Sequence, residues 1–393
     1  MNLKEQKNLI QLYNKFDILL EKGDGVYLYD NKGNKYLDFF SGIGVNALGY
    51  NNKYYNNALK KQINKILHIS NLFHNQNIAL AAKNLAKASG LDRVFFTNSG
   101  TEAIEGALKV AKKFAFNKNI KNPQFIAFKN SFHGRTLGAL SLTANEKYQK
   151  PFKPLISGIK FAKFNDINSV EKLINEKICA IFIETIQGEG GINPANKEFY
   201  KNLRTLCDKM DILLIVDEIQ CGMGRTGKYF AYEHFEILPD ILTSAKALGC
   251  GVSVGAFVVS EKIAQKTLVP GDHGSTYGGN PFVCAAINAV FECFKKQNIL
   301  DNVNNLSAYF KNALLNLKNQ FSFIKEISGI GFMLGLSLNN TIKANDIVKE
   351  AQNNGLLIIT CGKNDLRFLP PLIITKENID EMVDKLSKSL KIF

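Results

Sequence analysis

The chain of 393 residues is long enough for two or three domains of about 150 residues each. Hydrophobic residues make up 46% of the sequence and charged residues 21%, proportions that are typical of a folded protein and exclude extended disorder. The net charge of +14 is dispersed in clusters no larger than pairs such as Lys60-Lys61, so we expect no nucleic-acid partner, which would need a continuous basic stripe.

The sequence also argues against a membrane span and against a disulfide framework. It contains no run of eighteen apolar residues, and Met1 to Lys22 lacks the unbroken apolar stretch of a secretory signal. The seven cysteines are odd in number and form no C-x-x-C motif, which favours a reducing compartment and disfavours a zinc ribbon. We therefore expect a cytoplasmic protein with no membrane partner.

An N-terminal hairpin is followed, from about Asn77, by short β-rich runs that alternate with helical stretches. The predicted strands are Gly25–Tyr29, Lys35–Leu37, Val94–Thr97, Phe125–Phe128, Ile178–Ile183, Leu213–Val216, Ile241–Leu242 and Gly255–Val259, and the predicted helices are Thr101–Phe116 and Asn196–Met210. Two of these strands are continuous apolar runs, as expected when both faces of a parallel sheet are covered. The alternation predicts an α/β fold with a large doubly wound mixed sheet.

The pattern changes after about Pro281 to that of a smaller α+β segment. Its predicted elements are helices at Phe282–Lys296, Leu300–Leu317, Ala344–Asn353 and Lys376–Leu390 and strands at Ile324–Glu326, Phe332–Leu336, Leu357–Ile359 and Leu366–Leu369. We expect a large domain at residues 50–285, and a discontinuous small domain at residues 1–49 and 286–393 that includes the hairpin.

The first candidate site is Asn98 to Glu102, which directly follows a predicted strand and opens a helix. Free N–H groups and the positive end of a helix favour an anion such as phosphate, and Gly100 would let the backbone approach it closely. The alternative is an ordinary helix cap, with Ser99 or Thr101 as capping residue. No dinucleotide-binding or P-loop motif occurs, so neither a dinucleotide nor a nucleoside triphosphate is favoured.

Two further candidates, Asp217 and Lys246, also follow predicted strands. In open α/β sheets ligands lie beyond the carboxyl ends of the strands, so both side chains are predicted to reach the ligand crevice. The alternative for Asp217 is a helix or loop cap. Lys246 is one of 44 lysines, so that it is singled out by its position after a strand and beside a glycine-rich turn. A phosphate cradle, a carboxylate and an amine on successive strand ends are together what pyridoxal phosphate requires: an anchor, a partner for the ring nitrogen and a group that links to the aldehyde.

With these residues the chain resembles a known family, the class III pyridoxal-phosphate aminotransferases of fold type I. Among them it resembles most of all the acetylornithine aminotransferases. The resemblance spans nearly the whole chain. The segments that carry it are Ser41–Gly49, Asn98–Glu102, Phe132–Thr136, Glu184–Gly191, Asp217–Gly227, Ser244–Gly249, His273–Pro281 and Leu366–Pro371. One departure is Cys250, which stands between Gly249 and Gly251 where many relatives have consecutive glycines, and whose small side chain we expect to be tolerated.

The resemblance assigns a role in cofactor binding to each motif. It implies that Lys246 is the catalytic Schiff-base lysine, that Asp217 pairs with the pyridinium nitrogen and that Gln220 hydrogen-bonds the 3-oxygen. The other cofactor-binding residues that it implies are Ser99, Gly100, Thr101, Phe132, Glu218, Ile219 and Thr276. Phe132 and Ile219 would contact the two ring faces, and Thr276 would reach the phosphate from the neighbouring subunit, so a homodimer with shared active sites is implied.

Arginine is scarce in this chain, since only five of the 49 positive residues are arginines. Bidentate carboxylate binding needs the planar guanidinium, and Arg135 and Arg367 match the family's two carboxylate-binding arginines. Arg225 is predicted to structure a loop, whereas Arg93 and Arg204 match no site motif and are predicted to lie on the surface.

The remaining site residues concern the substrate. The resemblance implies that Glu189 masks Arg367 for an ω-amine substrate and swings aside for glutamate, the alternative being a solvated loop carboxylate. It places Ser275 near the substrate, and His133 is predicted to orient other groups rather than to transfer protons.

The predicted activity is transfer of the ω-amine of N-acetylornithine to 2-oxoglutarate. Ornithine aminotransferases carry a tyrosine near the position of Gly42-Ile43-Gly44, where this chain has no hydroxyl. A small apolar wall suits an acylated nitrogen better than a buried ammonium. Ornithine, 4-aminobutyrate or succinylated substrates remain open, as does an aminomutase, which would need no second keto acid, and a non-catalytic basic binding protein.

Overall fold

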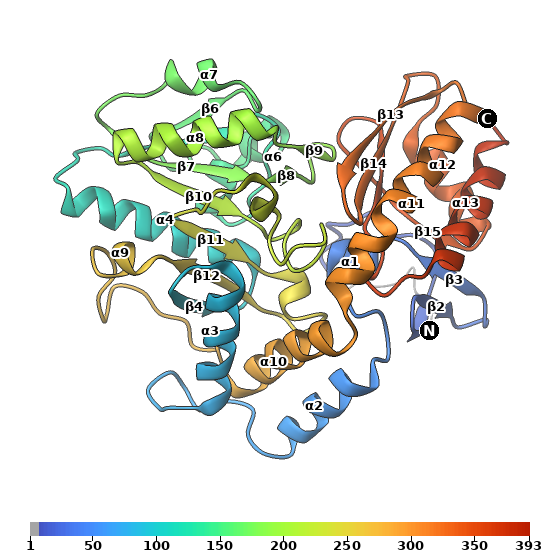
Figure 1. The fold of residues 1–393 in the computed structure, drawn as a ribbon, viewed down its shortest axis with the longest axis horizontal. Helices are drawn as coiled ribbons and strands as arrows, with labels where there is room; N and C mark the ends of the chain where they lie inside the picture. Colours follow the sequence, from blue (N-terminus) through green and yellow to red (C-terminus); the bar gives the residue numbers. More distant parts are fainter. Residues whose placement is uncertain (1–7) are drawn as a thin grey trace.

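The computed structural model describes residues 8–393, so that the first residues of the predicted small domain and of the Met1 to Lys22 segment lie outside the described range. Its largest sheet has seven strands in the order β4 (Arg93–Thr97), β12 (Gly255–Val259), β11 (Ile241–Ser244), β10 (Leu213–Asp217), β7 (Ile178–Glu184), β5 (Gln124–Phe128) and β6 (Ile159–Ala162) (Figure 1). All neighbours are parallel except β12, which is antiparallel to both β4 and β11. The predicted mixed α/β sheet is confirmed.

Helices cover both faces of this sheet because successive side chains of a strand point to opposite faces. On β10, Leu213 and Ile215 pack in one core with α4 (Gly100–Asn117), whereas Leu214 and Val216 pack in another with α8 (Lys197–Met210). Every residue of β7 and β10 is buried, which explains their continuous apolar runs.

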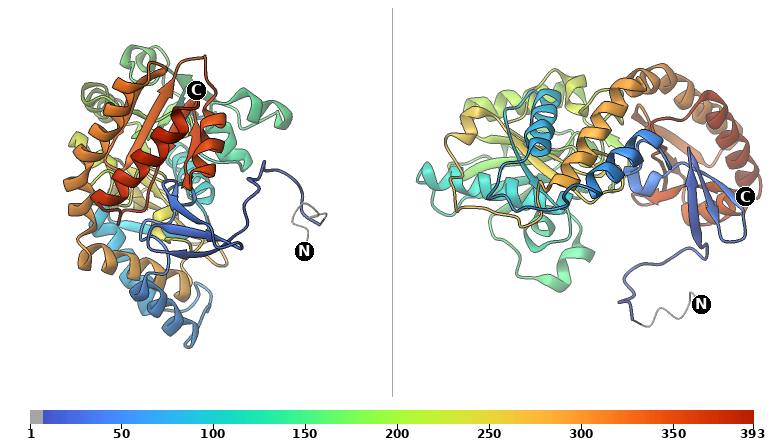
Figure 2. Two further views of the ribbon diagram at one scale, coloured as in Figure 1. Left: turned by 90° about the vertical axis from the view of Figure 1, so that its right-hand side faces the viewer. Right: turned by 90° about the horizontal axis from the view of Figure 1, so that it is seen from below.

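The C-terminal segment forms an antiparallel sheet in the order β13 (Ile324–Ile330), β14 (Met333–Leu338), β17 (Asp365–Phe368) and β16 (Ile359–Cys361). Helices α11 (Ile299–Gln320), α12 (Ala344–Asn353) and α13 (Lys376–Leu390) lie beside it (Figure 2). The long helix α10 (Pro281–Lys296) leads into this segment from the large sheet, and it packs against α2 (Lys53–Ile63) and α3 (Gln76–Ser89).

The N-terminal hairpin pairs with the C-terminal segment although the two are far apart in sequence. Strands β1 (Leu20–Asp24), β2 (Tyr27–Asp30) and β3 (Lys35–Asp38) are antiparallel, and β3 then pairs in parallel with β15 (Leu356–Leu357). This pairing supports the proposal that residues 1–49 and 286–393 form one discontinuous domain beside a domain at residues 50–285.

Short elements complete the described chain. They are α1 (Ser41–Gly44), α5 (Leu137–Leu142), α6 (Glu146–Gln149), α7 (Ile167–Glu171), α9 (Glu261–Ala264), β8 (Ile186–Gln187), β9 (Asn193–Pro194) and the 3₁₀ turns Lys150–Phe152, Ala231–Phe235 and Lys246–Leu248. None of the helices in residues 8–393 has the length and apolar character needed to cross a membrane.

Candidate active site

A cavity of about 520 Å³ opens where the parallel strands of the large sheet end. Lys246 follows β11 and Asp217 ends β10, and Ser99, Gly100 and Thr101 enter the cavity from the start of α4. The structure thus brings together the three strand-end motifs that the sequence singles out.

Lys246 is held in an unusual environment for an amine. Its backbone φ is +45°, a left-handed conformation that non-glycine residues rarely adopt and that is often found at functional sites. Burial lowers the pKa of its ammonium group, and this effect outweighs the opposing charges of Asp217 and Glu189. A lowered pKa makes the uncharged, nucleophilic amine more accessible near neutral pH.

Asp217 is fixed by two hydrogen bonds at the floor of the cavity. Its Oδ2 lies 2.8 Å from Nδ1 of the buried His133, and its Oδ1 accepts the N–H of Ile219 at 3.0 Å. Burial acts to lower the pKa of His133, but the hydrogen bond and charge of Asp217 and the charge of Glu184 outweigh it, and the pKa is raised. This contact supports the prediction that His133 orients its neighbours.

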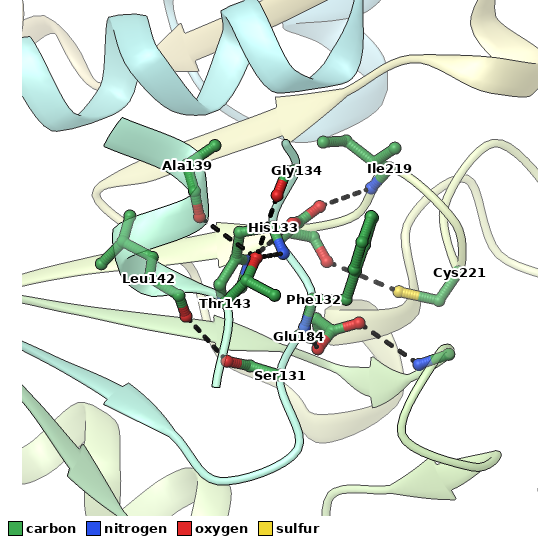
Figure 3. Close-up of polar contacts among 12 residues, drawn as sticks. Ser131, Phe132, His133, Gly134, Ala139, Leu142, Thr143, Glu184, Ile219 and Cys221 are labelled. Atoms are coloured by element: carbon green, nitrogen blue, oxygen red, sulfur yellow. Dashed lines mark hydrogen bonds and ion pairs between the residues drawn. The ribbon is translucent and has the colours of Figure 1, made fainter. Parts of the chain in front are cut away.

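Glu184, which was not among the predicted site residues, is a third carboxyl group in this region, beside Asp217 and Glu189. It ends β7, is buried, and accepts the N–H groups of Phe132 at 3.1 Å and Gly188 at 3.2 Å (Figure 3). Burial raises its pKa to about 7. The signal that identified Asp217, a carboxylate ending an apolar strand, was also present here.

The start of α4 forms an open anion cradle. Ser99 caps the helix by accepting the N–H of Glu102 at 3.3 Å, so that the capping alternative is correct for its side chain. The first amides of any helix have no intrahelical partner, and Gly100 and Thr101, the first residues of α4, line the cavity. A Cβ on Gly134 would lie 2.2 Å from Oγ1 of Thr101, so only glycine lets this loop approach the cradle.

Arg367, which is buried, and Glu189, which is partly exposed, form an ion pair next to Gln220, a residue that lines the cavity. The guanidinium of Arg367 also donates to Oε1 of Gln220 at 3.0 Å, and Gln220 Nε2 donates to Glu189 at 3.3 Å. Burial acts to raise the pKa of Glu189, but the charge and hydrogen bond of Arg367 outweigh it and lower the pKa. Glu189 is therefore not the solvated loop carboxylate of the alternative interpretation.

Arg135, unlike the buried Arg367, has an exposed side chain, which lies at the mouth of the cavity. It forms no ion pair with any residue in the described range 8–393. Its guanidinium carbon lies 3.5 Å from the centroid of the Tyr148 ring and 5.7 Å from that of Phe132. The N–H groups of this guanidinium are available to a ligand.

Not all of the predicted site residues line the cavity of this chain. The Glu218 carboxylate points away from it and accepts the Thr185 hydroxyl at 2.5 Å and the backbone N–H of Ala231 at 2.7 Å. Cofactor contact by its side chain is therefore not supported. Ser275 and Thr276 also lie outside the cavity lining; Ser275 Oγ accepts a hydrogen bond from Asn98 at 3.1 Å, and Thr276 is exposed.

The other arginines are only partly as predicted. Arg225 is buried and donates to the carbonyl oxygen of Pro370, consistent with a loop-structuring role. Arg93 is exposed on the surface, as expected. The prediction for Arg204 was wrong: only 14% of its side chain is exposed, because it bridges Asp240 and Asp208 at 2.8 Å each.

Comparison with known proteins is consistent with this geometry. The family model described as "Aminotransferase class-III" matches residues 11–390. The chain is 46% identical over 385 residues to an acetylornithine aminotransferase of Clostridium acetobutylicum, an alignment that covers 98% of this chain and 99% of that protein. The chain belongs to the class III aminotransferases.

Solved structures of class III relatives have the same fold. An ornithine aminotransferase from Toxoplasma gondii matches with a TM-score of 0.95 at 32% identity, covering 99% of this chain and 93% of that one. An N-acetylornithine aminotransferase from Stenotrophomonas maltophilia matches with a TM-score of 0.85 at 33% identity, covering 97% of both chains.

The protein is thus a pyridoxal-phosphate-dependent aminotransferase that acts on small-molecule amino-acid substrates. The described residues fit this cofactor. Lys246 offers a desolvated amine, Asp217 a fixed carboxylate and α4 a glycine-lined anion cradle. Phe132 and Ile219 supply apolar surface for the two faces of a planar ring.

Proposed function

We propose that this enzyme transfers the ω-amino group of N2-acetyl-L-ornithine to 2-oxoglutarate, giving N-acetylglutamate 5-semialdehyde and glutamate, and that it serves arginine biosynthesis in the cytoplasm. The observation that carries the proposal is the Arg367–Glu189 pair beside Lys246, because it makes carboxylate binding next to the reacting amine conditional. The named activity of relatives up to 46% identical supports it.

The first half-reaction needs an amine beside Lys246 and a carboxylate at the far end of the substrate. Arg135, at the mouth of the cavity, would bind the α-carboxylate of N-acetylornithine through its free N–H groups. Arg367 stays paired with Glu189, so that no free cation attracts a carboxylate to the position of the ω-amine.

When bound, pyridoxal phosphate supplies a carbonyl carbon that takes up the amine and a conjugated ring that withdraws electrons from the substrate carbon as its proton leaves. Asp217, whose carboxylate is held by His133, would keep a proton on the ring nitrogen and so would maintain that electron withdrawal. The Lys246 amine, whose pKa is lowered by burial, would accept the proton that leaves the substrate carbon and would serve as its donor in the return step. Ser99, Gly100 and Thr101 would hold the phosphate, and Gln220 would hydrogen-bond the 3-oxygen.

The second half-reaction needs Arg367. The α-carboxylate of 2-oxoglutarate must lie beside the reacting carbon, so Glu189 swings away and Arg367 binds that carboxylate, while Arg135 binds the distal one. Glu189 can move because 36% of its side chain is exposed, whereas the Arg367 side chain is only 2% exposed and stays in place.

The choice of an acylated substrate depends on the wall formed near Val45, which lines the cavity. A free α-ammonium, as in ornithine, would need a polar partner there. The neighbouring Gly42, Ile43 and Gly44 offer no side-chain oxygen or nitrogen. The structural likeness to the Toxoplasma gondii ornithine aminotransferase keeps free ornithine as the second candidate substrate.

We further propose that the enzyme is a homodimer in which Thr276 of one subunit completes the site of the other. In this chain Thr276 is exposed and lies outside the cavity lining, as that arrangement requires.

The test compares kcat/KM for N-acetylornithine, ornithine, succinyl-diaminopimelate and 4-aminobutyrate, each with 2-oxoglutarate. We expect N-acetylornithine to be preferred over ornithine. We expect succinylated substrates to be accepted as well, because an apolar wall does not select strongly between acyl groups. A preference for free ornithine would contradict the proposal and leave only the aminotransferase class.

A further inference from the structure

Arg135 and Tyr148 form a stacked pair between two adjoining cavities. Arg135 lines the cavity of about 520 Å³ that contains Lys246, whereas Tyr148 lines a second, more polar cavity of about 500 Å³. Phe132 lines both. The guanidinium of Arg135 lies over the Tyr148 ring at 3.5 Å from its centroid, so that the ring covers one face of the cation.

The backbone on both sides of Arg135 is already fixed by other contacts. The N–H of His133 donates to Oγ1 of Thr143 at 2.9 Å, and the Thr136 hydroxyl donates to Oε1 of Glu105 at 2.5 Å. These contacts hold the residues close to Arg135, so that the position of the guanidinium depends mainly on the side-chain torsions of Arg135. A long, exposed arginine side chain has many rotamers to lose on binding a ligand.

We propose that Tyr148 is a positioning residue that holds the guanidinium of Arg135 in the orientation that binds substrate carboxylates. Stacking uses the face of the guanidinium and leaves its N–H groups free at the edge, where a carboxylate binds in a bidentate manner. The tyrosine thus lowers the entropic cost of binding without occupying any donor. This inference rests on the proposed function, in which Arg135 is the carboxylate-binding arginine for both substrates.

The ring, rather than the hydroxyl group, carries the proposed role. The structure shows no hydrogen bond from the Tyr148 hydroxyl to any residue among 8–393. Tyr148→Phe should therefore behave as the wild-type enzyme, whereas Tyr148→Leu, which keeps apolar bulk but removes the aromatic face, should not.

The experiment measures steady-state kinetics of the holoenzyme and competitive inhibition by glutarate, a dicarboxylate that lacks a reacting group. In Tyr148→Leu we expect KM for N-acetylornithine and 2-oxoglutarate and the inhibition constant of glutarate to rise about three- to tenfold, with kcat little changed. Phe152→Leu is the matched control, because Phe152 is an exposed aromatic residue on the adjacent turn, with 57% of its surface exposed.

Two further measurements separate positioning from a general structural role. Pentylamine carries no carboxylate, so its single-turnover reaction should be unaffected by Tyr148→Leu; slowing equal to that of N-acetylornithine would overturn the inference. In an Arg135→Ala background Tyr148→Leu should add nothing, since the pair acts as a unit.

The outcomes also distinguish this inference from the proposed function. If Arg135→Ala weakens carboxylate binding but Tyr148→Leu does not, the positioning role is wrong and the function stands. If Arg135→Ala leaves glutarate binding unchanged, the proposed substrate contact of Arg135 is wrong, and the role of Tyr148 falls with it.

Discussion

Two hydrogen bonds fix the carboxylate of Asp217, and its charge is what distinguishes it from an isosteric amide. In Asp217→Asn the neutral side chain cannot keep a proton on the ring nitrogen. Loss of a charge-assisted hydrogen bond costs about 1.5–3 kcal/mol. We expect kcat to fall about ten- to a hundredfold or more if that energy is lost in the transition state.

The check on this prediction is kcat measured with saturating cofactor, so that weaker cofactor binding does not contribute. Asp208→Asn, which changes an exposed carboxylate on α8, is the control and should retain normal activity. A near-normal kcat in Asp217→Asn would show that another group holds the ring nitrogen.

Arg367 and Arg135 differ in the half-reactions that they serve. Arg367→Lys keeps the charge but loses the planar guanidinium that binds a carboxylate through two N–H groups. We therefore expect the single-turnover rate with glutamate or 2-oxoglutarate to fall about tenfold or more, and the rate with N-acetylornithine to fall less. Arg135→Lys should damage both. Single-turnover rates with each substrate decide this, and equal losses in Arg367→Lys would contradict the role of Glu189 as a switch.

The Arg367–Glu189 pair also predicts how stability depends on pH. The pKa of Glu189 is lowered from its usual 4.5 in the folded protein, so its contribution to stability is present above pH 4.5 and is lost as the pH falls through the folded pKa. Because 36% of the Glu189 side chain is exposed, solvent screening reduces this contribution to about 1 kcal/mol.

Melting temperatures of the apoprotein between neutral and acidic pH test this sign. Glu189→Gln should melt lower than the wild type at neutral pH, and the two curves should converge as the pH falls below 4.5. Glu292→Gln, which removes an exposed pair with Lys296 within α10, should change little at any pH. If the difference in melting temperature between Glu189→Gln and the wild type grew as the pH fell, the stabilising role of the Glu189–Arg367 ion pair would be contradicted.

At the scale of elements, the loop before α5 and the start of α4 meet at Gly134. Its φ is +138°, and a Cβ there would lie 2.2 Å from Thr101 Oγ1. Gly134→Ala must therefore disturb the anion cradle, and we expect cofactor affinity to fall at least tenfold in addition to a loss of about 1–3 kcal/mol in stability. Gly33→Ala is a matched control, because it shares a positive φ, at +84°, but has no atom within 4 Å of the new Cβ.

Titration of the apoprotein with pyridoxal phosphate gives the affinity, and thermal melting gives the stability. Gly33→Ala should lose stability alone. If both variants bound the cofactor as the wild type does, the cradle would tolerate a side chain at Gly134 and the proposed phosphate site would be misplaced.

The elements that were predictable from sequence are those whose pattern follows from burial. The strands β7 and β10 have apolar runs because the sheet is covered on both faces, and α12 and α13 were predicted with their correct bounds. Edge strand β6 was missed, since it contains Lys160 and only Ala162 is buried. Helix α2 was missed because its Asn- and Lys-rich sequence has little apolar face, with Tyr55 its one buried apolar residue.

Part of the candidate site could likewise be predicted from the sequence. Residues at strand ends, such as Asp217, could be placed because topology alone brings strand ends together. The direction in which a side chain points beyond the strand end could not be predicted. Glu218 was expected to contact the cofactor, but its carboxylate accepts the backbone N–H groups of Ala231 and Tyr232 instead. The stacking of Arg135 on Tyr148 depends on tertiary packing and leaves no pattern in the sequence.

At the scale of the whole molecule, large apolar side chains are exposed on two loops that contact each other. Leu72 is 88% exposed, Phe73 70% and Tyr277 61%. Their loops are held together, since Asn71 donates to the carbonyl oxygens of Ser275 at 3.1 Å and Gly278 at 3.0 Å. Exposed apolar surface is common at protein–protein interfaces, and Tyr277 is the neighbour in sequence of Thr276, which we propose to act in the partner subunit.

If the active sites are shared between subunits, two inactive variants can restore activity when they form a mixed dimer, which a site within one chain cannot do. If Thr276 acts in the partner's site, a mixed dimer of one Lys246→Ala and one Thr276→Val subunit contains one site with both defects and one site with neither. Mixing and reassociating the two impaired variants in equal amounts should then restore about a quarter of wild-type activity, because half of the dimers are mixed and each has one intact site.

Lys246→Ala mixed with Asp217→Asn is the control, because both residues belong to the same chain's site. Each site of that mixed dimer keeps one defect, so no activity should return. Failure of the first mixture to regain activity, with subunit exchange demonstrated by mass labelling, would show that Thr276 acts within its own subunit or not at all.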